Sequence, residues 1–185
     1  MLPDADLSIC SWNVNSLKVR FEQLKTLLQT QRWDVICLQE TKMTDDRFPY
    51  EALRELGYHA FHIGQPTYNG VAILARGETP VEVRRGLEGE PEDAHSRYIE
   101  ADVKGVRVAS IYLPNGNPQP GPKFDYKLRW MDRLIAHTKT LLRHEEPIVL
   151  AGDYNIIPTD LDAKQPELWT QDALAQPESR ARFQT

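Results

Sequence analysis

Residues 147–159 read PIVLAGDYNIIPT, and this stretch decides the architecture expected for the whole chain. The apolar run at 148–151 has the character of a buried strand, and it ends in Gly152 followed by polar residues. Asp153 and Asn155 are separated by one residue, so on an extended segment their side chains point to the same side. Oxygen-bearing groups at a strand end are costly to bury without a partner, and a hard cation would be such a partner.

Two earlier apolar runs end in the same manner. Residues 7–12 are followed by Asn13, and residues 34–40, DVICLQE, finish in Glu40. Ligands of open α/β sheets bind where the strands end, so we expect these side chains to meet those that follow strand 148–151. Two carboxylates and two amides offer the oxygen ligands that Mg²⁺ prefers, and the sequence therefore predicts a candidate magnesium site.

Each of these residues also has an ordinary structural interpretation. Asn13 alone would be a turn residue after a strand. Glu40 alone would be solvated or paired with a neighbouring lysine such as Lys42. Asp153, which precedes a Pro-Thr-Asp turn, would serve capping and turn chemistry. The three together favour the metal site, although spacing and composition lead no further than that.

The rest of the chain alternates helical and extended patterns. Helical periodicity or propensity occurs at residues 17–30, 49–56, 123–143 and 165–184. Strand patterns, separated by Gly, Pro and Asn, occur at residues 58–63, 70–75, 97–103 and 106–112. Because helices separate the early strands while the middle strands follow one another directly, the pattern indicates a mixed α/β domain.

Length and composition exclude some classes of protein. The 185 residues suit one domain of ordinary size or most of a larger one, and no apolar run is long enough to span a membrane. The net charge of −5 argues mildly against a protein that coats nucleic acid, but a nuclease also needs clustered carboxylates. Cys10 and Cys37 lie in apolar runs and fit no disulfide or zinc framework, which favours a reducing, cytoplasmic setting.

Five segments together resemble the exonuclease III family of DNA-repair nucleases, within the endonuclease/exonuclease/phosphatase superfamily. In order, and at fitting intervals, they are WNVNSL, DVICLQETK, YNGVAIL, SIYLPNG and LAGDYNIIPTDLD. The resemblance extends from about residue 7 to the end, so residues 1–185 are expected to form a single domain. It implies the four-layer α/β/β/α sandwich of the DNase I-like fold, in which two sheets pack face to face with helices outside.

The resemblance also implies an activity. Family members hydrolyse DNA phosphodiester bonds with Mg²⁺, for which Mn²⁺ substitutes. They incise on the 5′ side of abasic sites and degrade duplex DNA from its 3′ ends. The expected partner is therefore double-stranded DNA with abasic sites or 3′ ends, and the complete enzyme is expected to be a cytoplasmic monomer that binds no membrane.

Site residues follow from the resemblance position by position. The implied metal-site residues, with Glu40 as the principal carboxylate, are Asn13, Glu40, Asp153 and Asn155. The implied catalytic residues are Tyr112, Asp153 and Asn155, of which the tyrosine contacts the scissile phosphate. The residues expected to approach the DNA backbone are Asn69 and Asn115.

The chain departs from the family pattern after Asp153. A later aspartate motif and a near-terminal Ser-Asp-His segment have no counterpart, and the last histidine is His144. From the resemblance we expect residues 1–185 to be the N-terminal two-thirds of such a domain, with an incomplete second sheet and impaired catalysis. Two alternatives remain: an inactive fragment or DNA-binding remnant, and a superfamily phosphatase acting on phospholipid or inositol phosphates. LQETK and PTDLD favour the DNA branch.

Overall fold

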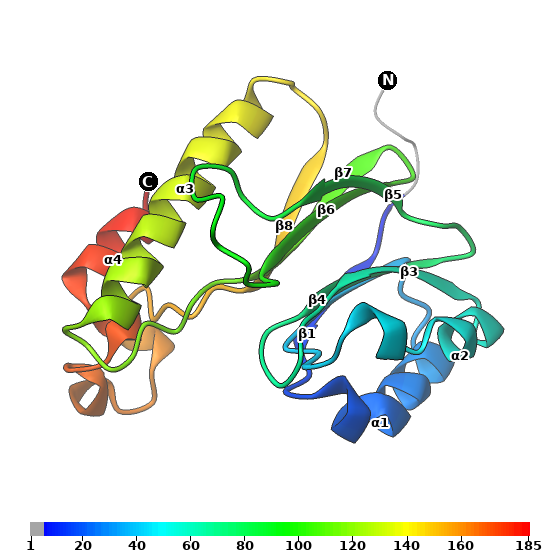
Figure 1. The fold of residues 1–185 in the computed structure, drawn as a ribbon, viewed down its shortest axis with the longest axis horizontal. Coiled ribbons are helices and arrows are strands. Elements are labelled where there is room, and N and C mark those ends of the chain that lie inside the picture. Colours follow the sequence, from blue (N-terminus) through cyan, green and yellow to red (C-terminus); the bar gives the residue numbers. More distant parts are fainter. Residues whose placement is uncertain (1–5) are drawn as a thin grey trace. The chain divides into compact units, whose positions relative to one another are not determined.

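The computed structural model describes residues 6–185, in which eight strands form two four-stranded sheets (Figure 1). The first sheet has the order β1-β2-β4-β3, and β1 runs parallel to β2 while β4 is antiparallel to both of its neighbours. Its strands are β1 (Ile9–Asn13), β2 (Val35–Gln39), β3 (Tyr58–Ile63) and β4 (Val71–Arg76). The carboxyl ends of β1 and β2 therefore lie at the same edge.

The second sheet follows the chain order β5-β6-β7-β8, and its last pair is parallel. Its strands are β5 (Val81–Arg85), β6 (Tyr98–Val103), β7 (Val106–Tyr112) and β8 (Ile148–Asp153). In the β7–β8 register, Tyr112 lies opposite Asp153. Both residues thus end their strands at the same point.

Both faces of the first sheet are buried, which explains why β2 reads as an uninterrupted apolar run. Val35 and Cys37 pack into a core shared with Ile99 and Val108 of the second sheet, so the two sheets lie face to face. Ile36 and Leu38 instead join the core beneath the helices.

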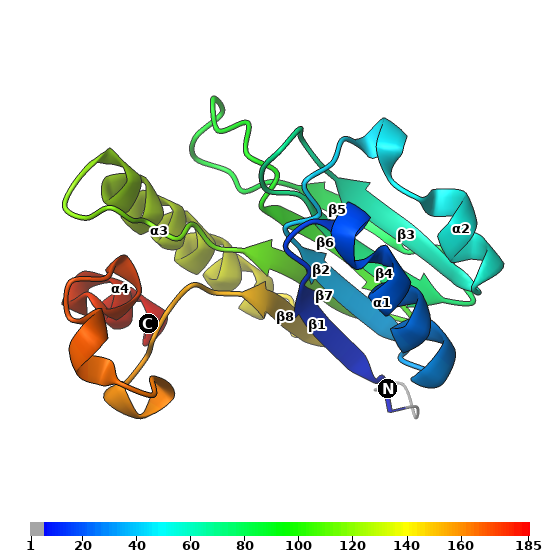
Figure 2. The same ribbon diagram turned by 90° about the horizontal axis from the view of Figure 1, so that it is seen from below.

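The outer face of the first sheet is covered by α1 (Leu17–Thr30) and α2 (Tyr50–Glu55). Leu17, Leu24 and Leu28 of α1 are buried against the sheet, and Figure 2 shows α1 lying across β2 and β4. Along each strand, residues that point to this outer face alternate with residues that point to the second sheet, as the two-residue period of a strand requires.

The described residues divide into two compact units. The first holds all eight strands together with α1 and α2. The second holds Leu87–Glu90, Leu113–His144 and Tyr154–Thr185, with α3 (Pro122–Leu142) and α4 (Pro177–Phe183) as its helices. Across residues 6–185, no helix combines the length and the apolar character needed to cross a bilayer.

The mixed α/β class with two sheets is confirmed, and α1 has the predicted bounds. Two segments differ from expectation. β5 was not predicted, because its sequence, VEVRR, leaves Val81 and Val83 exposed and carries three charges. Residues 165–184, where helical propensity was expected, form two 3₁₀ turns, Pro166–Trp169 and Ala173–Ala175, followed by α4, because proline cannot continue a preceding helix.

Candidate active site

Three of the predicted site residues meet at one edge of the first unit. Asn13 ends β1, Glu40 follows β2, and Asp153 ends β8. The Asn13 amide nitrogen, Nδ2, donates hydrogen bonds to Glu40 Oε1 at 2.9 Å and to Asp153 Oδ2 at 2.8 Å. One amide thus bridges two carboxylates that lie far apart in the sequence.

The orientation of the Asn13 amide is fixed by its other contact. Its oxygen, Oδ1, accepts the main-chain N–H of Asn15 at 3.0 Å, and only an oxygen can accept that bond. Both N–H groups are therefore directed to the carboxylates. Asn13 is a turn residue, as its ordinary interpretation predicted, and it also belongs to the site.

Glu40 is held in an unusual backbone conformation and carries a paired carboxylate. Its φ of 53° lies in the left-handed region, and Lys42 Nζ lies 3.2 Å from its Oε2. Burial alone would raise the pKa of Glu40, but hydrogen bonds from Asn13, Tyr112 and Lys42 hold that pKa below its ordinary value. Glu40 is therefore an ionised, partly desolvated carboxylate at neutral pH.

Tyr112 faces the same group from the end of β7. Burial raises the pKa of its hydroxyl well above the usual range, and the negative charges of Glu40 and Asp153 add to this effect. The guanidinium of Arg97 lies 4.9 Å from the centre of the Tyr112 ring. Tyr112 therefore keeps its proton and acts as a hydrogen-bond donor; Arg97 was not singled out from the sequence.

Gly152 explains how β8 delivers Asp153 to this edge. A Cβ atom at position 152 would lie 2.1 Å from the main-chain oxygen of Ile111 on β7. The strand pair therefore has no room for a side chain there. The glycine that precedes the aspartate in LAGDYN therefore allows the backbones of β7 and β8 to approach closely.

Asn155 departs from the geometry expected from the sequence. β8 ends at Asp153, and Asn155 has a φ of 45°, so the two residues do not lie on one extended segment. The expectation that their side chains point to the same side of a strand was therefore wrong. In the second unit, the Asn155 amide donates to the oxygen of Leu113 at 2.8 Å, and its Oδ1 lies 3.5 Å from Nδ2 of Asn115. The structure thus brings Asn155 and Asn115 together.

A buried lysine fixes these two asparagines. Lys127 of α3 is fully buried, and its ammonium donates to the main-chain oxygens of Asn115 and Asn155 at 3.1 and 2.5 Å. Both carbonyls receive a charge-assisted hydrogen bond, so the two loops are tied to one helix. Nothing in the sequence pattern distinguished Lys127 from the exposed cations of α3.

Asn69 lies in the loop between β3 and β4. Its side chain is 6% exposed, and the amide donates to Gln65 Oε1 at 3.1 Å. Its main-chain oxygen accepts the N–H of Lys42 at 2.9 Å. The neighbouring Tyr68 is 67% exposed, so Tyr68 rather than Asn69 forms the surface of this loop.

The two carboxylates offer oxygen ligands of the kind that hard divalent cations take. Within residues 6–185, no group of three or more His, Cys, Asp or Glu side chains could hold a metal ion. A cation at this edge would therefore be held by the carboxylates of Glu40 and Asp153 and would keep several waters. Mg²⁺ is commonly bound in this way, through one or two carboxylates together with substrate phosphate.

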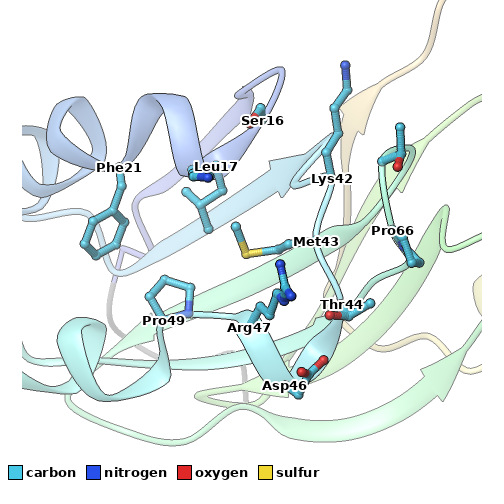
Figure 3. A pocket seen from close by; sticks show the side chains of 12 residues that line it. Ser16, Leu17, Phe21, Lys42, Met43, Thr44, Asp46, Arg47, Pro49 and Pro66 are labelled. Atoms are coloured by element: carbon cyan, nitrogen blue, oxygen red, sulfur yellow. The ribbon is translucent and has the colours of Figure 1, made fainter.

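A cavity of about 890 Å³ is lined in part by Lys42, the ion-pair partner of Glu40 (Figure 3). It lies between the start of α1 and the segment 42–49, and Lys42 belongs to both the cavity wall and the Glu40 pair. Its charged lining residues are Lys18, Lys42, Arg47 and Asp46. Because the charge of Lys42 is paired with Glu40, Lys18 and Arg47 against Asp46 leave one net positive charge, which makes this surface attractive to an anion.

The chain is similar in sequence to known nucleases. The profile of the Endonuclease/Exonuclease/phosphatase family matches residues 10–182. Exodeoxyribonuclease III of Haemophilus influenzae is 38% identical over 161 residues, which are 84% of this chain and 60% of that protein. Exodeoxyribonuclease of Bacillus subtilis is 30% identical over 165 residues, 87% of this chain and 63% of that protein. The chain thus spans about three fifths of the length of the curated relatives it matches.

Solved structures share the fold. The 3′ phosphatase NExo from Neisseria, bound to a product DNA hairpin, superimposes with a TM-score of 0.92 at 39% identity. An AP endonuclease from Archaeoglobus fulgidus gives a TM-score of 0.91 at 31% identity. Each comparison covers 97% of this chain and 69% of the other. The DNase I-like fold class expected from the sequence is confirmed.

Proposed function

Because this chain belongs to the endonuclease/exonuclease/phosphatase family, we propose that it acts as a divalent-metal-dependent hydrolase of DNA phosphodiester bonds. The observation that carries this proposal is the bridge that Asn13 forms between the carboxylates of Glu40 and Asp153. It places two oxygen ligands side by side at the edge where three strands end.

Glu40 and Asp153 would hold the cation, which we propose is Mg²⁺, with Mn²⁺ as a substitute. A bound Mg²⁺ supplies charge neutralisation at the phosphate oxygens and at the leaving oxygen. Asn13 contributes by keeping the two carboxylates in place, and its oxygen, which accepts one hydrogen bond from Asn15, has a second lone pair that could face a cation. Lys42 offsets part of the negative charge of Glu40.

Tyr112 and Asp153 carry the remaining chemistry at this edge. The Tyr112 hydroxyl donates a hydrogen bond to the phosphate as charge develops on it, and its raised pKa keeps that donor protonated. Asp153 orients the attacking water or removes its proton. In the second unit, Asn155, with Asn115 beside it, contacts the DNA backbone through its amide.

The proposed substrate is double-stranded DNA with an abasic site or a 3′ end. The names of the relatives support this class, since they include exodeoxyribonucleases, an AP endonuclease and a 3′ phosphatase bound to DNA. The cationic cavity beside Lys42 supports an anionic substrate in general. Cys10 and Cys37 are both free thiols, which supports a cytoplasmic setting.

The test is incision of a fluorescent duplex that carries one abasic-site analogue, with the 185-residue chain in Mg²⁺ and then in EDTA. Mg²⁺-dependent cutting on the 5′ side of the lesion, lost in Glu40→Gln, is the expected result. Retained binding of the duplex without any cutting would identify a DNA-binding remnant instead. Release of phosphate from an inositol phosphate in a parallel reaction would favour the phosphatase branch of the family.

A further inference from the structure

The turn that presents Glu40 is strained. Glu40 and Lys42 have φ values of 53° and 54°, and neither residue is glycine. Side chains disfavour this left-handed region, so such conformations persist only where the surroundings impose them. Thr41 lies between the two residues and is fully buried. Whatever holds Thr41 therefore determines where the Glu40 carboxylate and the Lys42 ammonium lie.

Main-chain bonds hold part of this turn. Four main-chain hydrogen bonds of 2.8–3.2 Å join the turn to two neighbouring segments. Ser16 N and Leu17 N donate to the oxygens of Glu40 and Thr41, respectively. Thr41 N and Lys42 N donate to the oxygens of Gly70 and Asn69, respectively. These bonds fix the path of the backbone. They leave the side chain of Thr41 available for a separate anchor.

That anchor is His62 of β3. Thr41 Oγ1 lies 2.8 Å from Nε2 of His62, whose side chain is completely buried and whose ring stacks on Phe48 at 4.1 Å. A Cβ atom on Gly70 would lie 2.0 Å from the Thr41 hydroxyl oxygen. The glycine in YNGVAIL therefore leaves room for this contact.

The chain of contacts continues to Asp45. Nδ1 of His62 lies 2.8 Å from Asp45 Oδ1, although the ring N–H is not aimed along that line. Burial lowers the pKa of His62 to about 4 despite this carboxylate, so the ring is neutral at pH 7. In the tautomer with the proton on Nδ1, the nitrogen beside Asp45, Nε2 accepts the hydroxyl proton of Thr41.

We propose that Asp45, His62 and Thr41 form a positioning chain that fixes the turn bearing Glu40 and Lys42; Thr41 and His62 are buried, and the Asp45 carboxylate lies at the exposed end of the chain. The order Asp-His-Thr is that of a nucleophilic triad, but the Thr41 hydroxyl is buried and committed to His62, so no substrate reaches it. Thr41 and His62 are positioning residues that act through Glu40. The inference rests on the proposed function for the role of Glu40, and its geometric part stands by itself.

The first test measures amide hydrogen exchange at Ser16, Leu17 and Lys42, the donors of three bonds to or from the turn. In Thr41→Val, protection of these amides is expected to fall by about tenfold or more, because an isosteric side chain no longer bonds His62. Thr41→Ser keeps the hydroxyl and should restore protection to within about threefold of the wild type. Thr26→Val removes an exposed helical hydroxyl and serves as the matched control.

A second variant guards against a folding defect. His62→Phe keeps an aromatic ring stacked on Phe48 but removes the polar contacts to Thr41 and Asp45. If Thr41 and His62 act as one unit, the double variant Thr41→Val with His62→Phe should lose no more amide protection than either single variant. Unchanged exchange in Thr41→Val would overturn the proposal. So would an equal loss of protection at the amides of Ile73 and Leu74 in β4, which would show a merely structural role.

The kinetic readout separates this inference from the proposed function. If the wild-type chain incises abasic DNA, Thr41→Val should lower kcat by about 100-fold with KM within about twofold, since misplacement of a reacting group chiefly affects the chemical step. Wild-type kcat in Thr41→Val would overturn the positioning role and leave the proposed function intact. If the wild type does not cut, the proposed function fails, while the exchange experiment still decides the positioning chain.

Discussion

Asn13 Nδ2 and Asp153 Oδ2 are joined by a hydrogen bond of 2.8 Å although 140 residues separate them in the chain. The second N–H of the same amide goes to Glu40. Two carboxylates placed together repel each other, and one of them would tend to bind a proton. The amide between them donates a hydrogen bond to each carboxylate, which offsets their mutual repulsion and holds both at one edge.

Replacement of Asn13 tests this bridge. In Asn13→Ala the carboxylates lose their common donor, and we expect Mg²⁺-dependent incision to fall by roughly 10–100-fold, as for the loss of outer-shell partners at metal sites. Asn13→Asp should be worse, because it adds a third negative charge. Incision rates of both variants within a factor of three of the wild type would show that the bridge is dispensable.

Tyr112→Phe removes one donor and leaves the ring beneath Arg97. We expect incision to fall by roughly 100-fold or more, the cost of losing one preorganised donor, with little change in thermal stability. Because the pKa of Tyr112 is raised, its proton stays bound in the folded protein through pH 10. The incision rate of the wild type should therefore not fall between pH 8 and pH 10 through loss of the Tyr112 proton. A fall in that range that is present in the wild type and absent in Tyr112→Phe would contradict the assigned protonation state.

Gly152→Ala tests the close approach of β7 and β8. The added methyl group would meet the Ile111 oxygen at 2.1 Å, and we expect a loss of roughly 1–3 kcal/mol in the free energy of unfolding. Gly105→Ala is the comparison, since no atom lies within 4 Å there and only its positive φ opposes a side chain. Urea unfolding that ranks Gly105→Ala as the more damaging change would refute the packing argument.

Lys127→Met keeps the length of the side chain but leaves the oxygens of Asn115 and Asn155 without their shared donor. A buried carbonyl without a partner costs roughly 1–3 kcal/mol, so we expect a clear drop in melting temperature. Faster hydrogen exchange should be confined to the second unit. Lys123→Met, at an exposed position of the same helix, should behave as the wild type; equal melting temperatures for the two variants would exclude the anchoring role.

The strand ends were predictable because their apolar runs are short and each stops at a polar residue. Residues 17–30, 58–63 and 106–112 have the bounds that periodicity predicts. β5 was missed because its apolar alternation is limited to Val81 and Val83 and is followed by two arginines; both valines are exposed, so the segment adds nothing to a core. Asn155 was misplaced because periodicity cannot reveal a positive φ just after a strand.

The positioning chain was not predictable in the same way. His62 and His59 are three residues apart on β3, so their side chains point to opposite faces of the strand and give no sequence signal of a shared site. Its role depends on Thr41 and Asp45, which the fold brings to either side of the ring. Lys127 was likewise hidden, because a lysine in an amphipathic helix reads as solvent-exposed until the loops that it anchors are in place.

The central claim, that Glu40 and Asp153 form a site for one divalent cation, is tested most directly by Mn²⁺ binding, followed through the electron paramagnetic resonance signal of the free ion. The wild-type chain should show one saturable site. Glu40→Gln and Asp153→Asn should each weaken it by more than the roughly 10–100-fold typical of an outer-shell change. Glu22→Gln, an exposed carboxylate of α1, should leave it unchanged. Equal Mn²⁺ affinity in the wild type and in Glu40→Gln, or no saturable binding at all, would contradict the account.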